Sequence, residues 1–324
     1  MTSHEPDVSI VLPVYNERGH LEQELDRIRR SMDASGLHYE LIVVDDGSSD
    51  GSGDLARELG DVRLITLAEN RGSGAARRAG TTASRGEIVV WTDVDMTSPT
   101  DRIPELVAQL EDHDQVVGAR TSEEGTVKAL RVPAKYFIRR LASYLVETRI
   151  PDLNSGFRAF RRDVGMQFIH ELPDGFSCVT TLTMSFLSHG YSVRYVSIPY
   201  AERSGRSKFH WWSDTTRYLR QVVRMALSYN PLRVFMPTGL VILAGALTKL
   251  VFDWATRDFA LAANTLLLFL VAFQVLTTGL VADLVARGQK PSDLLPSSRQ
   301  HVEDLGPTTS QRSDQVPEDL PEAG

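Results

Sequence analysis

Two aspartates, Asp93 and Asp95, stand one residue apart directly after the apolar run at residues 87–92. A short run rich in β-branched residues is typical of a strand that is buried on both faces. The two carboxylates would therefore lie at the end of a strand, where open α/β sheets bind their ligands. Carboxylate oxygens suit Mg²⁺ or Mn²⁺, which also take phosphate oxygens from a substrate. Alone the pattern is a weak signal, since strand ends are often acidic simply to meet water.

Two further strand-to-loop junctions precede this pair of acids. The apolar run at residues 8–12 leads into the sequence Pro-Val-Tyr-Asn-Glu at residues 13–17. A second run, residues 41–44, leads into Asp-Asp-Gly-Ser-Ser-Asp at residues 45–50. Helical spacing of leucines follows each run, so the order strand, helix, strand, helix, strand predicts a doubly wound, mostly parallel α/β sheet. Because such sheets bind ligands at the carboxyl ends of their strands, we expect all three acidic loops to meet at one crevice.

A glycine pattern in the same region would fit a different class of protein. Residues 51–56 match the G-x-G-x-x-A pattern of dinucleotide-binding oxidoreductases. In those enzymes the acid that binds the ribose follows the glycines by about 20 residues, whereas here three aspartates precede them. A turn that leads into the second helix explains these glycines better.

The composition narrows the class of protein further. With 324 residues the chain can bury a full core, and its net charge of −7 argues against a general nucleic-acid-binding protein. The single cysteine, Cys178, excludes an internal disulfide and fits a reducing compartment. Residues 1–7 are polar, so no N-terminal signal is visible.

The last third of the chain has two long apolar stretches, at about residues 234–252 and 259–284. Each is long enough to cross a bilayer of roughly 30 Å, and the short connection between them predicts a transmembrane hairpin within residues 231–287. Arginines and lysines flank the outer ends of the hairpin. The positive-inside rule therefore predicts a multi-pass cell-membrane protein whose N-terminal domain and C-terminus are cytoplasmic.

The segments on either side of the hairpin have different characters. Residues 210–230 interleave aromatic and aliphatic residues with arginines, which predicts an amphipathic helix at the membrane interface. Residues 288–324 are polar, acidic and rich in proline, which predicts a disordered cytoplasmic tail. The folded cytoplasmic domain would then be residues 1–209.

Four segments, in order, resemble the inverting family-2 glycosyltransferases with the GT-A fold. They are residues 13–17, residues 45–50, Asn-Arg-Gly at residues 70–72, and Asp-Val-Asp at residues 93–95. The resemblance covers about the first 210 residues. A narrower likeness, to the dolichyl- and polyprenyl-phosphate sugar synthases, rests on residues 118–120, 154–158 and 203–208.

The resemblance implies a set of site residues. The segment at residues 70–80 adds to this set, because its arginines and a helix N-terminus could bind a diphosphate. A metal ion, Mg²⁺ or Mn²⁺, would be held by Asp93 and Asp95. The nucleotide-sugar donor would contact Pro13, Tyr15, Asn16, Glu17, Asp45, Asp46, Asp50, Arg71, Gly74, Arg77 and Asp93. The acceptor phosphate would contact Arg120, Arg139, Ser155, Arg158, Arg203 and Lys208. Of these, Asp93, Asp95, Arg120 and Arg203 are expected to act in catalysis.

The implied reaction is an inverting transfer of a sugar from GDP-mannose or a UDP-hexose to polyprenyl or dolichyl phosphate. A phosphate acceptor is already ionised at neutral pH and needs no strong base. Two alternatives stay open: transfer to a glycolipid or glycan hydroxyl, which requires a carboxylate base, and an inactive membrane scaffold. In many relatives the second aspartate of the D-x-D pair is followed by Leu-Gln-Asp-Pro. Here Asp95 is followed by Met-Thr-Ser-Pro at residues 96–99. This departure leaves the identity of the sugar open. The sequence does not indicate the oligomeric state.

Overall fold

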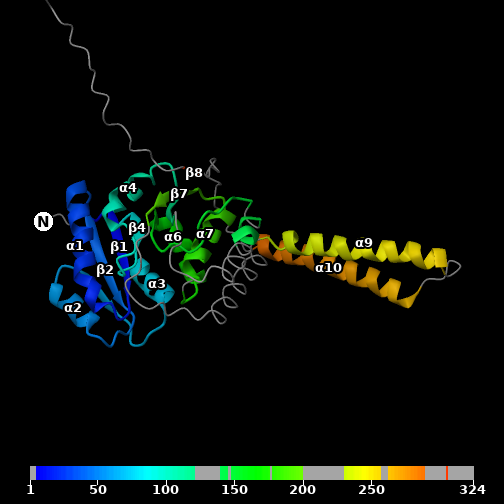
Figure 1. Cartoon of the computed structure of the whole chain (residues 1–324), viewed down its shortest axis with the longest axis horizontal. Helices are drawn as coiled ribbons and strands as arrows, with labels where there is room; N and C mark the ends of the chain where they lie inside the picture. The colour runs from blue at the N-terminus through cyan, green and yellow to red at the C-terminus, as the bar shows by residue number, and fades with distance from the viewer. Residues whose placement is uncertain are drawn as a thin grey trace, which may run out of the picture.

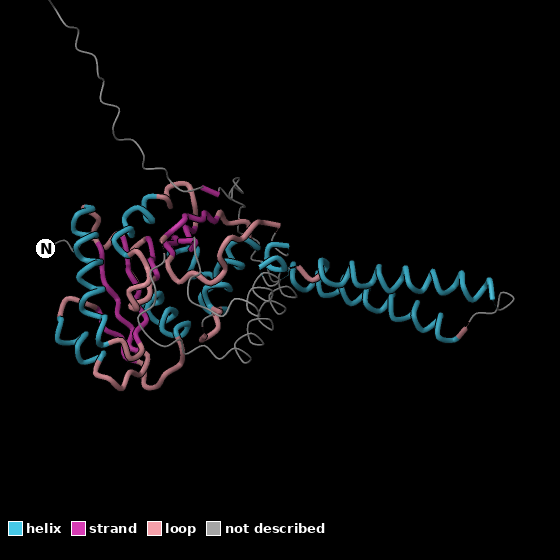
Figure 2. Tube along the Cα trace, in the orientation of Figure 1, coloured by secondary structure: helices cyan, strands magenta, loops and turns pink. Residues whose placement is uncertain are grey.

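The computed structural model of the chain describes residues 5–120, 139–144, 147–175, 177–199, 230–256, 262–288 and 304–305. Two parts are visible in Figure 1: a sheet covered by helices, and a long pair of helices that projects from it. Figure 2 shows the strands of the sheet lying between helices on its two faces. The predicted interface helix at residues 210–230 lies outside the described residues, apart from its last residue.

The sheet is mixed, with the strand order β3-β2-β1-β4-β6-β5-β7-β8. Its strands are β1 (Val8–Val14), β2 (Tyr39–Asp45), β3 (Arg63–Thr66), β4 (Ile88–Trp91), β5 (Gln115–Arg120), β6 (Arg158–Arg161), β7 (Val193–Ile198) and β8 (Asp304–Leu305). Every neighbouring pair is parallel except the two made by β6, which runs antiparallel to β4 and β5. The prediction of a mostly parallel, doubly wound sheet is confirmed. The two-residue strand β8 lies within the tail that was predicted to be disordered.

Helices cover both faces of the sheet because the strands are apolar on both sides. The helices are α1 (Arg18–Ser35), α2 (Ser52–Leu59), α3 (Ser73–Ala83), η1 (Thr100–Arg102), α4 (Ile103–Ala108), α6 (Arg162–Phe168), η2 (Ile169–Glu171) and α7 (Cys178–Ser188). Alternate residues of β1 point to opposite faces, so Ile10 and Leu12 pack beneath α1 whereas Val11 packs on the side of α3. A left-handed glycine, Gly36 (φ 74°), ends α1 and returns the chain to β2.

The projecting hairpin consists of α9 (Leu232–Thr256) and α10 (Ala263–Gly288). Both helices are long and apolar enough to cross a membrane, and their outer side chains are exposed, as at Val241 (72%) and Leu284 (70%). Small residues let the two helices approach closely, since a Cβ on Gly239 would lie 2.5 Å from Leu276 and one on Gly279 would lie 2.5 Å from Phe235. The helices begin and end a few residues from the predicted spans.

One contact region joins the hairpin to the sheet domain among the described residues. The Arg233 guanidinium, at the start of α9, donates to the backbone carbonyl of Tyr144 and forms an ion pair with Glu147. It also lies over the Tyr144 ring, 5.5 Å from the ring centre. The hairpin is therefore fixed to the segment that contains and follows the helical residues 139–144.

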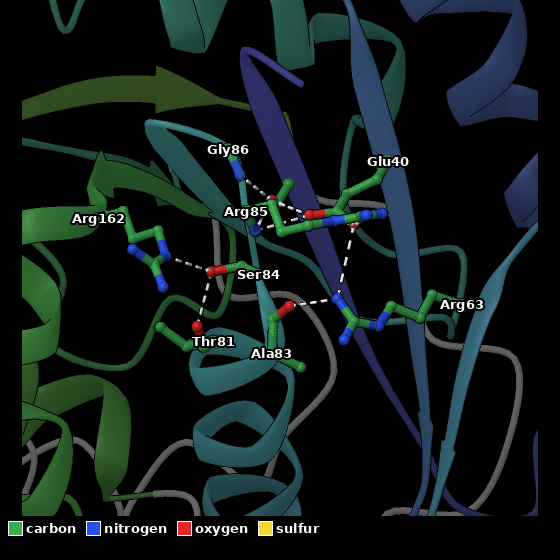
Figure 3. Close-up of polar contacts among 9 residues, drawn as sticks. Glu40, Arg63, Thr81, Ala83, Ser84, Arg85, Gly86 and Arg162 are labelled. Carbon is green, nitrogen blue, oxygen red and sulfur yellow. Dashed lines mark hydrogen bonds and ion pairs between the residues drawn. The ribbon is translucent and has the colours of Figure 1, made fainter. Parts of the chain in front are cut away.

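A polar cluster closes the opposite end of the sheet, where β1, β2 and β4 begin (Figure 3). The Glu40 carboxylate accepts hydrogen bonds from Ser9 Oγ (2.7 Å), from the Arg85 backbone N–H (2.7 Å) and from the Arg85 guanidinium (3.1 Å). Ser9 Oγ in turn accepts from the backbone of Gly86 (2.8 Å). These bonds connect the start of β2 to the turn that leads into β4, at the end of the sheet away from the acidic loops.

We expect Glu40→Ala to lower the free energy of unfolding by about 2 kcal/mol at pH 7, because charge-assisted hydrogen bonds contribute about 1.5–3 kcal/mol. Burial raises the pKa of Glu40, but the bonds from Ser9 and Arg85 outweigh burial and hold the pKa below its usual value of 4.5. The contribution is thus complete above pH 4.5 and is lost as the pH falls through the lowered pKa. Unfolding of wild type, Glu40→Ala and Glu40→Gln between about pH 7 and pH 3 checks this. A stability difference that stays constant over that range would contradict it.

Candidate active site

The carboxyl ends of β1, β2 and β4 lie side by side. The parallel register aligns Val14 with Asp45, and Val11 with Trp91, so the three acidic loops leave the sheet at one edge. The loops at residues 13–17 and 45–50 follow the first two strands, and Asp93 and Asp95 follow the third. The structure therefore brings together the three segments that the sequence singled out.

The first two loops are held together by hydrogen bonds between them. Asn16, with a left-handed backbone (φ 56°), accepts from the Ser49 backbone through its side chain (2.8 Å). Asp50 accepts from the Arg18 backbone (3.1 Å) and from Ser52 Oγ (2.5 Å). Burial raises the pKa of Asp50, but these hydrogen bonds outweigh burial and the pKa lies below its usual value. Asn16 and Asp50, expected at the donor, are thus engaged in joining the loops.

The two adjacent aspartates after β2 are buried and have different partners. Asp45 (5% exposed) accepts from the Ser48 backbone at 3.0 Å. Asp46 (2% exposed) accepts from the backbones of Arg71 and Gly72, each at 2.8 Å. Asp46 therefore fixes the loop that leads into α3. Tyr15, the first residue after β1, is by contrast 38% exposed.

The N-terminus of α3 is covered by the loop before α7. The backbone N–H groups of Gly74 and Ala75 both donate to the Asp174 carbonyl, at 2.7 and 3.1 Å. Gly74 allows this approach, since a Cβ there would lie 2.1 Å from the Pro173 carbonyl oxygen. The Asp174 carboxylate also pairs with Arg71 at 3.7 Å. The helix N-terminus that was expected to close over a diphosphate is thus occupied by the chain itself, and sequence reasoning missed Asp174.

Asp93 and Asp95 follow β4 at the carboxyl edge of the sheet, where the crevice was predicted, and both carboxylates accept hydrogen bonds from the chain. The Asp93 Oδ1 accepts from Arg77 Nη2 at 2.6 Å, and the Asp93 side chain is 37% exposed. The Asp95 Oδ1 accepts from the Thr97 hydroxyl at 2.6 Å. Between the pair and this threonine, Met96 has a left-handed backbone (φ 60°), a strained conformation of the kind that collects at functional sites.

The donor set at this edge fits a hard divalent cation that shares its coordination with a substrate. No group of three or more His, Cys, Asp or Glu side chains that could hold a metal occurs within the described residues. Two carboxylates are what Mg²⁺ commonly takes from a protein when phosphates and waters complete the octahedron. Asp93 and Asp95 therefore suit a metal brought with a diphosphate better than a resident metal in a closed cage.

Two arginines of the predicted site lie in the core beneath these acids. Arg77 (1% exposed) and Arg158 (0% exposed) both lie against the Trp91 ring, 5.6 and 6.0 Å from its centre. Burial lowers the pKa of Arg77, but Asp93 and Cys178 outweigh it and the pKa is raised. Burial lowers the pKa of Arg158 to about 10. Arg77 was expected at the donor and Arg158 at the acceptor phosphate, and the structure places both side chains in the core.

Arg158 instead fixes the backbone around the crevice. Its guanidinium donates to the carbonyls of Val179 (2.7 Å) and Ser155 (2.5 Å) and to Thr183 Oγ1 (2.9 Å). Ser155 is itself buried (3% exposed). The bonds tie the segment before β6 to the first turns of α7, so Arg158 and Ser155 have structural partners in the described chain.

The third group of predicted residues gathers at the end of β5. Arg120 forms a two-point ion pair with Asp152, with Nε–Oδ2 at 2.7 Å and Nη2–Oδ1 at 2.9 Å. Burial raises the pKa of Asp152, but Arg120 and backbone N–H groups outweigh it and hold the pKa below its usual value. Arg139 donates to the Pro151 carbonyl at 3.1 Å. Asp152 was missed from the sequence, and the predicted Arg203 and Lys208 lie outside the described residues.

Comparisons with known proteins match both parts of the chain. The model of glycosyl transferase family 2 matches residues 9–167, and the model of the GtrB C-terminal hairpin matches residues 230–287. An undecaprenyl-phosphate 4-deoxy-4-formamido-L-arabinose transferase of Proteus mirabilis is 30% identical over 300 residues, covering 86% of this chain and 88% of the relative. The transferase of the same description from Shewanella sediminis is 28% identical over 314 residues, covering 92% of both chains.

Solved structures show the same fold over about two thirds of the chain. A mycobacterial protein aligns with a TM-score of 0.55 and 25% identity, over 69% of this chain and 74% of that one. Glucosyl-3-phosphoglycerate synthase from Mycobacterium tuberculosis, in complex with Mn²⁺, UDP-glucose and phosphoglyceric acid, aligns with a TM-score of 0.53 and 24% identity, over 69% and 79%. The predicted GT-A architecture is confirmed.

Proposed function

The chain belongs to glycosyl transferase family 2, and we propose that it transfers a sugar from a nucleoside diphosphate donor to the phosphate of a polyprenyl lipid. The observation that carries the proposal is the joining of two features in one chain. Asp93 and Asp95 lie at the carboxyl edge of the sheet, and the apolar hairpin α9–α10 is fixed to the same domain. Two relatives that match over most of the chain are undecaprenyl-phosphate sugar transferases.

The donor would lie across the ends of β1, β2 and β4. Asp93 and Asp95 would hold Mg²⁺ or Mn²⁺ together with the diphosphate, and Tyr15 would offer its exposed ring to the base. When bound, the cation supplies positive charge to the leaving nucleoside diphosphate. Asp46, which follows β2, would hold the neighbouring loop in place for the donor, since its carboxylate accepts hydrogen bonds from the backbone at residues 71–72.

The acceptor would approach from the side of β5 and the hairpin. Its phosphate oxygen attacks the anomeric carbon in line with the diphosphate oxygen, so one C–O bond forms as the other breaks and the configuration inverts. An ionised phosphate needs no carboxylate base, and the first turn of α7 contains no acidic residue. The Arg120 guanidinium, oriented by Asp152, would provide positive charge for this phosphate, with Arg203 and Lys208 as further candidates.

The membrane arrangement follows from the same assignment. A polyprenyl phosphate keeps its tail in the bilayer, so the acceptor site must lie close to the membrane surface. We place the domain of residues 1–209 and the C-terminal tail on the cytoplasmic side, with α9 and α10 crossing the membrane and residues 210–230 at its surface. Positive charges before α9 and after α10 support this orientation.

We expect purified protein in detergent to move radiolabel from one nucleotide sugar into polyprenyl phosphate, and chelation of divalent cations to abolish the transfer. A panel of UDP- and GDP-sugars, with Mg²⁺ or Mn²⁺, identifies the donor when label is extracted with the lipid. A parallel reaction with a non-phosphorylated glycolipid tests the hydroxyl acceptor. Label in the glycolipid alone, or in neither acceptor despite nucleotide binding, would contradict the proposal.

A further inference from the structure

The strongest unassigned feature is a buried ion pair that reaches from the core to the crevice. Arg77 lies on α3, and its guanidinium extends to the Asp93 carboxylate, which follows β4. The Arg77 side chain is 2% exposed and the Asp93 side chain is 37% exposed. One end of the pair is therefore held rigidly by the core while the other meets solvent at the site proposed for the donor.

We propose that Arg77 is a positioning residue, which fixes the Asp93 carboxylate in the orientation that receives the donor's metal-bound diphosphate. The inference rests on the proposed function. It replaces the direct contact between Arg77 and the diphosphate that the sequence suggested, because a guanidinium buried to this extent acts on a donor only through the group it touches.

Three neighbours hold the Arg77 guanidinium in place. Nη2 donates to Asp93 Oδ1 at 2.6 Å, Nη1 contacts Cys178 Sγ at 3.8 Å, and the Trp91 ring centre lies 5.6 Å from Cζ. A planar guanidinium with fixed donor directions restrains a carboxylate more tightly than a flexible ammonium would. The Asp93 carboxylate is thus restrained from the side of the core.

Gly156 leaves room for the same carboxylate because it has no side chain. A Cβ on Gly156 would lie 2.5 Å from Asp93 Oδ2 and 2.8 Å from Arg77 Nη2. Asp93 is therefore enclosed between a guanidinium and a stretch of backbone without a side chain. An oriented ligand of this kind loses little freedom when it binds a cation, and partners behind metal ligands typically change affinity or activity by about 10–100-fold when removed.

Stability alone does not account for the pair. Arg77 Nε is buried and has no hydrogen-bond partner among the residues that the structure describes. Burying a charge in this way is costly, and a well-packed apolar residue is often as stable or more so in such a position. The pair is explained if its exposed end has a function, namely to orient the Asp93 carboxylate at the proposed donor site.

The test is a double-mutant cycle measured by binding of Mn²⁺ with UDP and Mn²⁺ with GDP to the full chain in detergent. We expect Arg77→Met to weaken binding of the preferred nucleotide by about tenfold. Arg77→Lys should bind more tightly than Arg77→Met but more weakly than wild type, because lysine keeps the positive charge but lacks the planar guanidinium with its fixed donor directions. The double variant Arg77→Met/Asp93→Asn should bind no more weakly than Asp93→Asn alone, since Arg77 acts only through Asp93.

Additive losses in the cycle would overturn the inference, as would full affinity in Arg77→Met. Val90→Ala, which leaves a cavity in the core of β4, serves as a control, because it should lower the unfolding temperature without changing nucleotide affinity. If wild type binds neither nucleotide, the proposed function fails and this inference fails with it. Binding by wild type with an additive cycle would reject only the role of Arg77.

Discussion

Asp95→Asn is expected to lower sugar transfer by about 100-fold or more while leaving the fold intact, since loss of one well-placed electrostatic contact commonly costs about 10²–10³-fold in turnover. The Asp95 Oδ1 accepts from the backbone and the hydroxyl of Thr97, at 3.3 and 2.6 Å. Asparagine retains that oxygen, so the turn after β4 should keep its shape. What the substitution removes is one of the two negative charges at the proposed metal site.

The measurement is transfer of label to polyprenyl phosphate by wild type and Asp95→Asn, with thermal unfolding of both in the same detergent. Asp101→Asn is a matched control, because Asp101 lies in the same connection but pairs with Arg27 outside the crevice. It should transfer at the wild-type rate. Wild-type turnover by Asp95→Asn would show that the metal assignment is wrong.

The strands and acidic loops could be predicted because their signals are local. Runs of β-branched residues mark β1, β2 and β4, and acids occur within a few residues of the end of each run. A parallel sheet then brings the ends together without any knowledge of side-chain contacts. The same is true of α9 and α10, whose length and apolar composition alone indicate the hairpin.

The partners of the charged residues could not be predicted in the same way. Arg77 and Arg78 are adjacent on α3, yet Arg77 is buried against Asp93 whereas Arg78 pairs with Asp174 near the surface. Apart from Arg77, the buried face of α3 is formed by alanine, glycine and threonine, which give a weak apolar pattern. The sequence therefore grouped Arg77 with the cations expected around the diphosphate, and its burial could not be predicted because charged residues are rarely fully buried.

The partners of the acids could not be predicted either, because they lie far away in the sequence. Asp152 meets Arg120 across 32 residues, and Asp46 meets the Arg71 backbone across 25. An aspartate that caps a neighbouring backbone has the same sequence signature as one that binds a ribose. The fold adds that both oxygens of Asp50 accept hydrogen bonds from the chain, from the Arg18 backbone and from Ser52.

Gly156→Ala is expected to reduce transfer by about 100-fold, because a shift of about 1 Å in a reacting group can cost that much. The backbone of Gly156 is not in the left-handed region, so alanine is tolerated conformationally and the obstacle is space. Its Cβ would lie 2.5 Å from Asp93 Oδ2 and 2.8 Å from Arg77 Nη2. An isolated carboxylate could turn aside at small cost. Here Asp93 is held by a buried arginine, so relief of the clash must displace the ion pair itself.

The comparison that isolates this effect is Gly19→Ala, a second change of glycine to alanine. Gly19 lies in the first turn of α1. Apart from the adjoining helix backbone, no atom of the described residues lies within 4 Å of the position that an alanine Cβ would take there. Alanine there should raise stability by up to about 1 kcal/mol through helix propensity and leave transfer unchanged. If both variants transfer sugar at the wild-type rate, the carboxylate is not confined as the structure indicates. A different outcome is that Gly156→Ala loses transfer while its nucleotide binding and unfolding temperature stay close to wild type. That result would show that the backbone at residue 156 contacts the acceptor, and that the substitution does not act through Asp93.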